Sequence, residues 1–176
     1  MTERPLDRLL GMKIGVFLAL LSLLFGFGLG GVFGAAEDSI KGHLEAEAQA
    51  VLATVYHGDQ AKMDKTLSKS WTYFKRAHLH ANGLGTAALA MILLLSCTAA
   101  VGRLEQLTAA LLGGGALGYA SFWMFAGLTA PGLGGTGAAK EALQWLAVPT
   151  SGACILGLIL VLFVFGKAAF AGGSSD

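Results

Sequence analysis

The sequence contains few charged residues, and this scarcity excludes most classes of soluble protein. Lys, Arg, Asp and Glu together make up 13% of the chain, whereas about 25% is usual for a soluble domain. Hydrophobic residues make up 55% of it. The formal net charge is only +1 and the basic residues form no continuous stripe, so we expect no binding to nucleic acid.

Cysteine and recognisable catalytic motifs are also scarce. Cys97 and Cys154 are the only two cysteines, and both lie inside apolar segments, where a cysteine ordinarily acts as a small packing residue. The sequence has no Walker loop, nucleophile elbow or Cys-x-x-Cys pair. Its long apolar runs hold none of the Asp, Glu, Lys or Arg that ion transport usually needs. We therefore expect no catalytic activity from the chain on its own.

Long uncharged runs dominate the rest of the sequence. They cover residues 14–36, 81–102, 107–130 and 142–166, and each reaches the roughly 20 apolar residues that cross a bilayer as a helix. The sequence therefore predicts an all-α integral membrane protein. We expect one membrane domain over residues 1–176, in which four transmembrane helices form a bundle within the lipid bilayer.

The flanks of the first run predict its orientation. Three basic residues precede it, whereas Glu37 and Asp38 follow it. Because basic flanks favour the cytoplasmic side and the first helix usually dominates, both termini are expected in the cytoplasm. The outer segments would then hold more basic residues than the inner ones, but most of them lie in one loop that carries as many acids. The membrane we expect is the cytoplasmic membrane of a bacterium.

The loop at residues 37–75 should be helical and extracytoplasmic. Apolar residues recur there at helical spacings of three, four or seven, first Ile40, Leu44, Val51, Leu52 and Val55, then Met63, Leu67, Trp71 and Phe74. The intervening His57-Gly58-Asp59 has the form of a helix stop followed by a new N-cap. Two arrangements fit this pattern. The helices either lie on the bilayer, anchored by Trp71 and Tyr73, or cap a site at the membrane surface.

Glycines recur at every fourth residue in two of the runs. Gly26, Gly30 and Gly34 mark the first run, and Gly114 and Gly118 mark the third. Small residues at this spacing let helix backbones approach closely in lipid. Three partners fit such a face: a helix of the same bundle, another membrane subunit or a second copy of the chain.

Two of the four histidines, His78 and His80, stand where the second run begins. On a helix they point about 200° apart, so one ion cannot readily bind both. They can be interfacial residues that bond lipid headgroups beside Lys75 and Arg76, or they can bind a metal or cofactor. Asn82 lies one turn further in, where an unsatisfied amide is costly.

Residues 78–85, HLHANGLG, have the form H-x-H-x-N-x-x-G. This segment resembles the second helix of small membrane proteins related to the haem-binding subunit of haem–copper oxidases. The resemblance implies that His78 or His80 is an axial ligand of a haem b near the outer membrane face. If a cofactor is bound, Asn82 is a candidate partner of its ligand. The resemblance also implies a role in electron transfer within a redox complex. The chain has no histidine after His80, so it lacks the other metal ligands of that family and no oxygen-reducing site is expected.

A six-coordinate haem needs a second axial ligand. The candidates are His43 and His57, expected on roughly one face of the outer helix, Met91 and Met124 in the spans, and a histidine of a second copy. Arg76 could pair with the haem propionates. The alternative function is that of a non-catalytic membrane anchor or assembly subunit of a larger complex.

Overall fold

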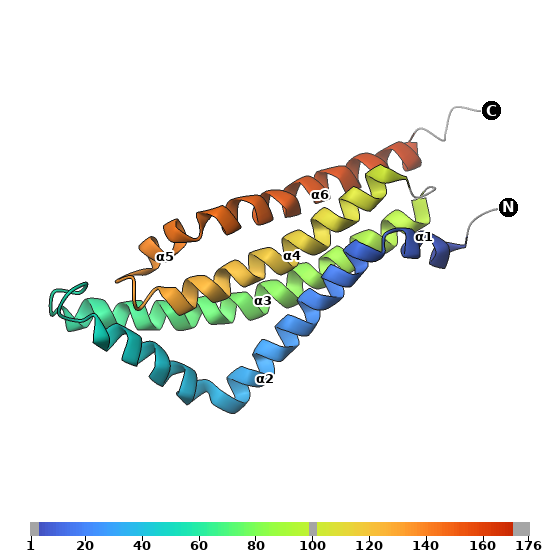
Figure 1. The fold of residues 1–176 in the computed structure, drawn as a ribbon. Coiled ribbons are helices and arrows are strands. Elements are labelled where there is room, and N and C mark those ends of the chain that lie inside the picture. The colour runs from blue at the N-terminus through green and yellow to red at the C-terminus, as the bar shows by residue number, and fades with distance from the viewer. Residues whose placement is uncertain (1–3, 99–101, 171–176) are drawn as a thin grey trace, which may run out of the picture.

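The computed structural model describes residues 4–98 and 102–170 of the chain. Their helices are α1 (Pro5–Gly11), α2 (Lys13–Ala50), α3 (Gln60–Thr98), α4 (Arg103–Thr129), α5 (Thr136–Ala142) and α6 (Gln144–Phe170), and Figure 1 shows the long ones side by side. Four of them, α2, α3, α4 and α6, are long and apolar enough to cross a membrane. The prediction of an all-helical chain with four candidate spans is therefore confirmed. The end of the second predicted run, at residues 99–101, lies outside the described residues.

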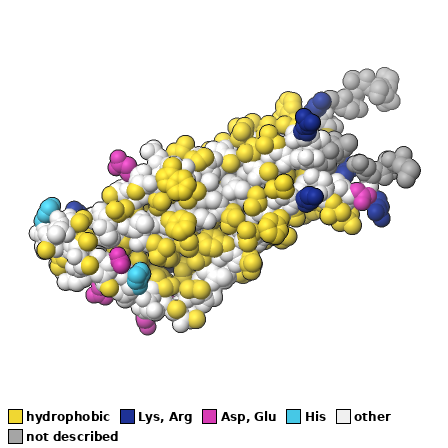
Figure 2. Space-filling view, viewed as in Figure 1, with side chains coloured by type: hydrophobic (Ala, Val, Ile, Leu, Met, Phe, Trp, Pro, Cys, Tyr) yellow, Lys and Arg dark blue, Asp and Glu magenta, His cyan; other side chains and the backbone are white. Residues whose placement is uncertain are grey.

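The segments that join the first two candidate spans are continuations of their helices, and we call this end of the molecule the outer end. Helix α3 contains 39 residues, which at about 1.5 Å per residue is roughly 58 Å, about twice the thickness of the hydrocarbon core. Residues 60–75 therefore extend the direction of the span as part of one helix. Residues 37–50 likewise belong to α2. Figure 2 shows the result on one face, an apolar middle with charged side chains at both ends.

Helix α2 is kinked where its apolar part ends. Ala36 has non-helical backbone angles, with φ −140° and ψ 24°, and the acidic pair Glu37 and Asp38 follows it directly. In Figure 1 the two halves of α2 meet at this bend, so that α2 diverges from α3 and then returns to it. The kink thus separates a membrane-length half from a polar half.

The outer end of the molecule is closed by a small packed cap. Helix α2 ends at Ala50, and the apolar residues Val51, Leu52 and Val55 pack around the buried Ala48, Tyr56 and Met63. The Tyr56 hydroxyl donates to the carbonyl oxygen of Pro131 at 2.8 Å, which ties this turn to the segment after α4. Asp59 caps α3 by accepting from the Lys62 amide at 2.9 Å, as the sequence predicts.

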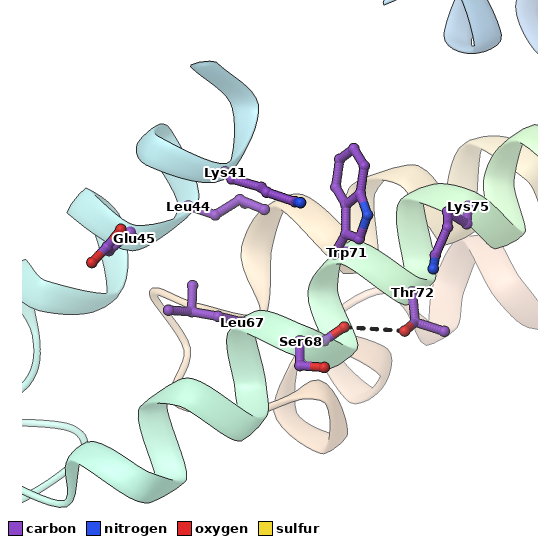
Figure 3. A pocket seen from close by; sticks show the side chains of 8 residues that line it. All are labelled: Lys41, Leu44, Glu45, Leu67, Ser68, Trp71, Thr72 and Lys75. Atoms are coloured by element: carbon purple, nitrogen blue, oxygen red, sulfur yellow. Dashed lines mark hydrogen bonds between the residues drawn. The ribbon is translucent and has the colours of Figure 1, made fainter. Parts of the chain in front are cut away.

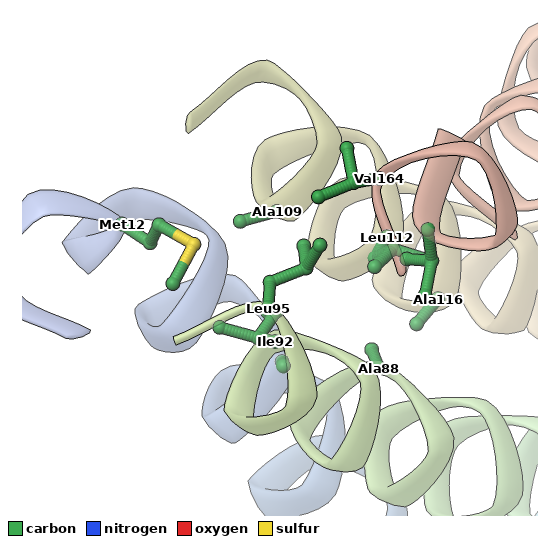
Figure 4. Close-up of a cluster of buried hydrophobic side chains, with 10 residues drawn as sticks. Met12, Ala88, Ile92, Leu95, Ala109, Leu112, Ala116 and Val164 are labelled. Carbon is green, nitrogen blue, oxygen red and sulfur yellow. The ribbon is translucent and has the colours of Figure 1, made fainter. Parts of the chain in front are cut away.

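Deep inside the bundle, small side chains let α4 contact both α2 and α6. The main cluster of buried apolar residues, shown in Figure 4, consists of Met12, Ala19, Ala88, Ile92, Leu95, Ala109, Leu112, Ala116, Val161 and Val164. A Cβ on Gly113 would collide with the Gly15 carbonyl of α2, and one on Gly118 would collide with Thr150 of α6. Gly114 makes only an ordinary contact, whereas a Cβ on Gly115 would lie 2.7 Å from the Cys154 sulfur. Glycine packing of α4 is therefore internal to the bundle.

Candidate functional site: the histidines of α3

His78 faces α2 and bonds its backbone. Its Nδ1 atom lies 2.7 Å from the carbonyl oxygen of Gly26, and its ring meets the ring of Phe33 edge-on with centroids 6.1 Å apart. A carbonyl oxygen can only accept, so the short distance requires a proton on Nδ1. The neutral ring then keeps an unprotonated Nε2, with its lone pair free for a donor or a metal.

The glycine stripe of α2 makes room for this arrangement. A Cβ on Gly30 would lie 2.9 Å from Cε1 of His78, and one on Gly26 would lie 2.7 Å from the Asn82 side chain. A Cβ on Gly34 would meet nothing within 4 Å. Two of the three predicted glycines therefore serve the contact between α2 and α3 within the chain.

Asn82 lies in the same interface, one turn below His78. Its Nδ2 donates to the His78 carbonyl oxygen at 3.1 Å. Its Oδ1 atom is buried and has no hydrogen-bond partner among the described residues. Such an acceptor costs about 1–3 kcal/mol when it is left unsatisfied. A second cross-helix bond lies nearby, where buried Ser22 donates to the carbonyl oxygen of Ala81 at 3.0 Å.

His80 faces α4, in a cluster of aromatic residues and one arginine. Its Nδ1 lies 2.8 Å from the carbonyl oxygen of Arg76, one turn earlier on α3. Its ring contacts Tyr119 and Trp123, with centroid distances of 5.3 and 5.9 Å. The Arg76 guanidinium lies over Trp123 at 4.9 Å and over Tyr73 at 5.4 Å, contacts in which a cation is attracted to the ring face. Each histidine therefore belongs to a different helix interface.

The outer histidines are placed elsewhere. His43 lines a surface groove together with Glu47 of α2 and Leu128, Thr129, Gly132 and Leu133 from the end of α4 and the following turn. His57 lies in the turn after α2, with a left-handed φ of 56°. The expectation that His43 and His57 share a helix face was wrong, because α2 ends at Ala50. The apolar spacing of residues 51–55 reflects packing of the cap instead.

These positions bear on whether haem b fits. The contacts that hold the His78 ring come from Gly26, Gly30, Phe33 and Asn82, and none of these is an iron ligand. Met91 lines an apolar groove formed by α3, α4 and α6, away from the α2 interface. Within residues 4–98 and 102–170 no group of three or more His, Cys, Asp and Glu side chains could hold a metal ion. The residues that contact the His78 ring thus offer no second axial ligand.

Comparisons with known proteins add no relative. No family model, no curated protein and no solved structure matches the chain.

The structure also forms a cleft near the bend of α2. The sequence indicated only that the helices of residues 37–75 could cap a site at the membrane surface, and it did not identify the residues of that site. The cleft lies between the outer half of α2 and α3 and is lined in part by Lys41, Trp71 and Lys75. The helical spacing of Trp71 and Lys75, one turn apart on α3, was the available signal. The opposing Lys41 could not be paired with them, because the kink at Ala36 sets its position.

Proposed function

We propose that the chain is a non-catalytic membrane subunit that holds a partner protein through the outer halves of α2 and α3. The observation that carries this proposal is the extension of α3 as one helix of 39 residues, well past the length of a span. The bond between Tyr56 and Pro131 ties the tip of this extension to the end of α4. A helical pair fixed in this way presents a defined polar surface outside the bilayer.

The polar residues of the α2–α3 interface support the same role. His78, Asn82 and Ser22 bond backbone carbonyl groups, two of them on the facing helix. In membranes, side chains of this kind join helices where water is absent. The positions of His78 and Ser22 are accounted for by holding α2 and α3 together.

We place the extension outside the cytoplasm, in a bacterial cytoplasmic membrane. The opposite end carries five described basic residues and two acidic ones, Arg4, Arg8, Lys13, Arg103, Lys167, Asp7 and Glu105. The extended end carries equal numbers of both signs, with Lys41, Lys62, Lys65, Lys69, Lys75, Arg76 and Lys140 against Glu37, Asp38, Glu45, Glu47, Asp59, Asp64 and Glu141. The extended end holds more Lys and Arg in total, but the first helix usually decides the orientation, and it has three basic residues before its apolar part and an acidic pair after it.

The test is purification of the tagged full-length chain from its own membranes in a mild detergent. A subunit co-purifies with one partner at a fixed stoichiometry and as one band in native electrophoresis. The charge reversals Glu47→Lys and Asp64→Lys on the extension should reduce the recovered partner, because like charges across an interface cost several kcal/mol. Lys167→Glu at the opposite end is the control. A chain that always purifies alone contradicts the proposal.

Haem b binding is the second candidate, favoured by one observation. His78 and His80 both have Nδ1 within 2.8 Å of a backbone carbonyl oxygen, the arrangement that orients metal-binding imidazoles and leaves Nε2 free. Either ring would give one axial ligand, and the second would come from a partner or another copy. When bound, a haem supplies a one-electron redox centre.

A reduced-minus-oxidised spectrum of the purified complex, with iron analysis, tests this candidate. A haem b signal that is lost in His78→Ala or His80→Ala supports it. Absence of an α-band and of iron in the wild-type complex overturns it without affecting the subunit proposal.

A further inference from the structure

A polar cleft opens between the outer half of α2 and the facing part of α3. Its volume is about 360 Å³, and its lining consists of Lys41, Leu44, Glu45, Leu67, Ser68, Trp71, Thr72 and Lys75. Figure 3 shows the α2 residues on one side and the α3 residues on the other. The bend at Ala36 separates the helices here, and the apolar residues Leu44 and Leu67 line the part nearer the tip.

Two lysines line this cleft from different helices, Lys41 from α2 and Lys75 from α3. The Lys41 Nζ lies over the Trp71 ring, 5.0 Å from its centroid, and it is also paired with Glu37. In Figure 3 the Lys75 side chain lies on the other side of Trp71 from Lys41. Glu45 points away from both in this view. The cleft therefore combines two ammonium groups with the hydroxyl of Ser68, whereas the Thr72 hydroxyl donates to the Ser68 carbonyl oxygen at 3.0 Å.

We propose that this cleft binds the phosphate headgroup of an anionic phospholipid. Ammonium groups bind phosphate as point charges, and the Ser68 hydroxyl can donate to one of its remaining oxygens. Basic residues near a membrane surface each attract anionic lipid by about 1 kcal/mol. The indole ring suits the headgroup level, where Trp is enriched.

The position of the cleft favours a lipid over free phosphate. Phe33, in the last apolar turn of α2, contacts Trp71 with ring centroids 5.3 Å apart, so the cleft begins where the apolar half of α2 ends. Below the bend, α2 exposes Phe27 and Val32, which are 71% and 48% accessible. A headgroup in the cleft thus leaves acyl chains beside an apolar surface that already faces lipid.

The experiment uses the full-length chain in nanodiscs of zwitterionic phosphatidylcholine that contain a minor fraction of phosphatidylglycerol. Lipid retained after transfer to detergent is counted by native mass spectrometry. The test variant is Lys41→Gln/Lys75→Gln, which keeps the side-chain stems. The matched control is Lys65→Gln/Lys69→Gln, which removes the same charge from exposed positions of α3. Far-UV circular dichroism checks that all three proteins are folded.

Wild type and control should retain phosphatidylglycerol above its bulk fraction, and the test variant should lose about fivefold in affinity per lysine, roughly 25-fold for both. Equal losses in both variants overturn the proposal, because the effect would then be general surface charge. Displacement of the lipid by millimolar inorganic phosphate would assign the site to free phosphate and also overturn it. Lipid retention is measured without any partner protein, so it is independent of the subunit proposal.

Discussion

The Nδ1–H group of His78 on α3 is bonded to the carbonyl oxygen of Gly26 on α2, at a distance of 2.7 Å. The bond is possible because Gly26 and Gly30 have no side chains to occupy the space of the His78 ring and Asn82. The close contact of these two helices and the orientation of the imidazole therefore depend on each other. By contrast, Gly28, Gly31 and Gly34 of α2 face open space.

Substitution of Gly30 by valine should destabilise the bundle. The new Cβ would lie 2.9 Å from the His78 ring, so the ring must move, and overpacking of this kind costs about 1–3 kcal/mol. Gly28→Val is the matched control, since its Cβ meets nothing within 4 Å. Thermal unfolding in dodecyl maltoside, followed by circular dichroism, measures both. Equal midpoints for the two variants would contradict the close contact between Gly30 of α2 and the His78 ring.

The unpartnered Oδ1 of Asn82 leads to a second prediction. Asn82→Leu replaces a buried acceptor without a partner by an apolar group of similar size, and such a change is close to neutral or stabilising. Ser22→Ala should instead destabilise by about 0.6 kcal/mol, because it removes a buried bond between helices. Titration with sodium dodecyl sulfate compares the two. A loss above about 1 kcal/mol in Asn82→Leu would show that the amide is satisfied in the folded protein.

The helical content and the separation of the two histidines could be predicted because each follows from local pattern. Long uncharged runs predict spans, and a two-residue spacing places His78 and His80 on different faces, toward α2 and α4. The N-cap at Asp59 was equally local. In each case the signal lies within one helix or one turn.

The contacts between helices could not be predicted in this way. Nothing within the first run indicates that Gly26 lies beside Asn82, because the register of two helices depends on the whole interface. The outer helix was extended too far for a related reason. Val51 and Val55 keep helical spacing although α2 has ended, since both pack against the cap around Tyr56.

The short helix α1 should depend on Arg8. Its Nη1 donates to the carbonyl oxygen of Ser96, in the last turn of α3, at 3.3 Å, where a cation is favoured by the negative end of the helix. Arg8→Gln should cost about 0.5–1 kcal/mol and increase amide exchange in residues 5–11. Arg4→Gln is the control. Arg4 is exposed, and its ion pair in the described structure is with Asp7 of α1 and not with α3. Hydrogen–deuterium exchange in detergent measures both, and equal exchange of α1 in the two variants would argue against the bond.

The cap at the outer end should weaken at alkaline pH through Tyr56. Burial raises the pKa of its phenol, against a smaller lowering by a hydrogen bond with Thr66. A raised pKa in the folded state means that the folded protein keeps this proton more tightly than the unfolded chain. The stabilisation is therefore complete below about pH 10, the ordinary pKa of tyrosine, and is lost as the pH rises through the higher folded value.

Tyr56→Phe isolates this effect. It removes the donor to the Pro131 carbonyl oxygen and should cost about 1 kcal/mol at about pH 8. That difference from wild type should shrink as the pH rises above about 10, because only the wild type loses stability through this group. Tyr73→Phe keeps Tyr56 and should follow the wild-type pH dependence. Thermal unfolding of the three proteins between about pH 8 and 11 measures this dependence. If the difference in stability between wild type and Tyr56→Phe stayed constant over this range, Tyr56 would not be a buried, hydrogen-bonded phenol in the cap.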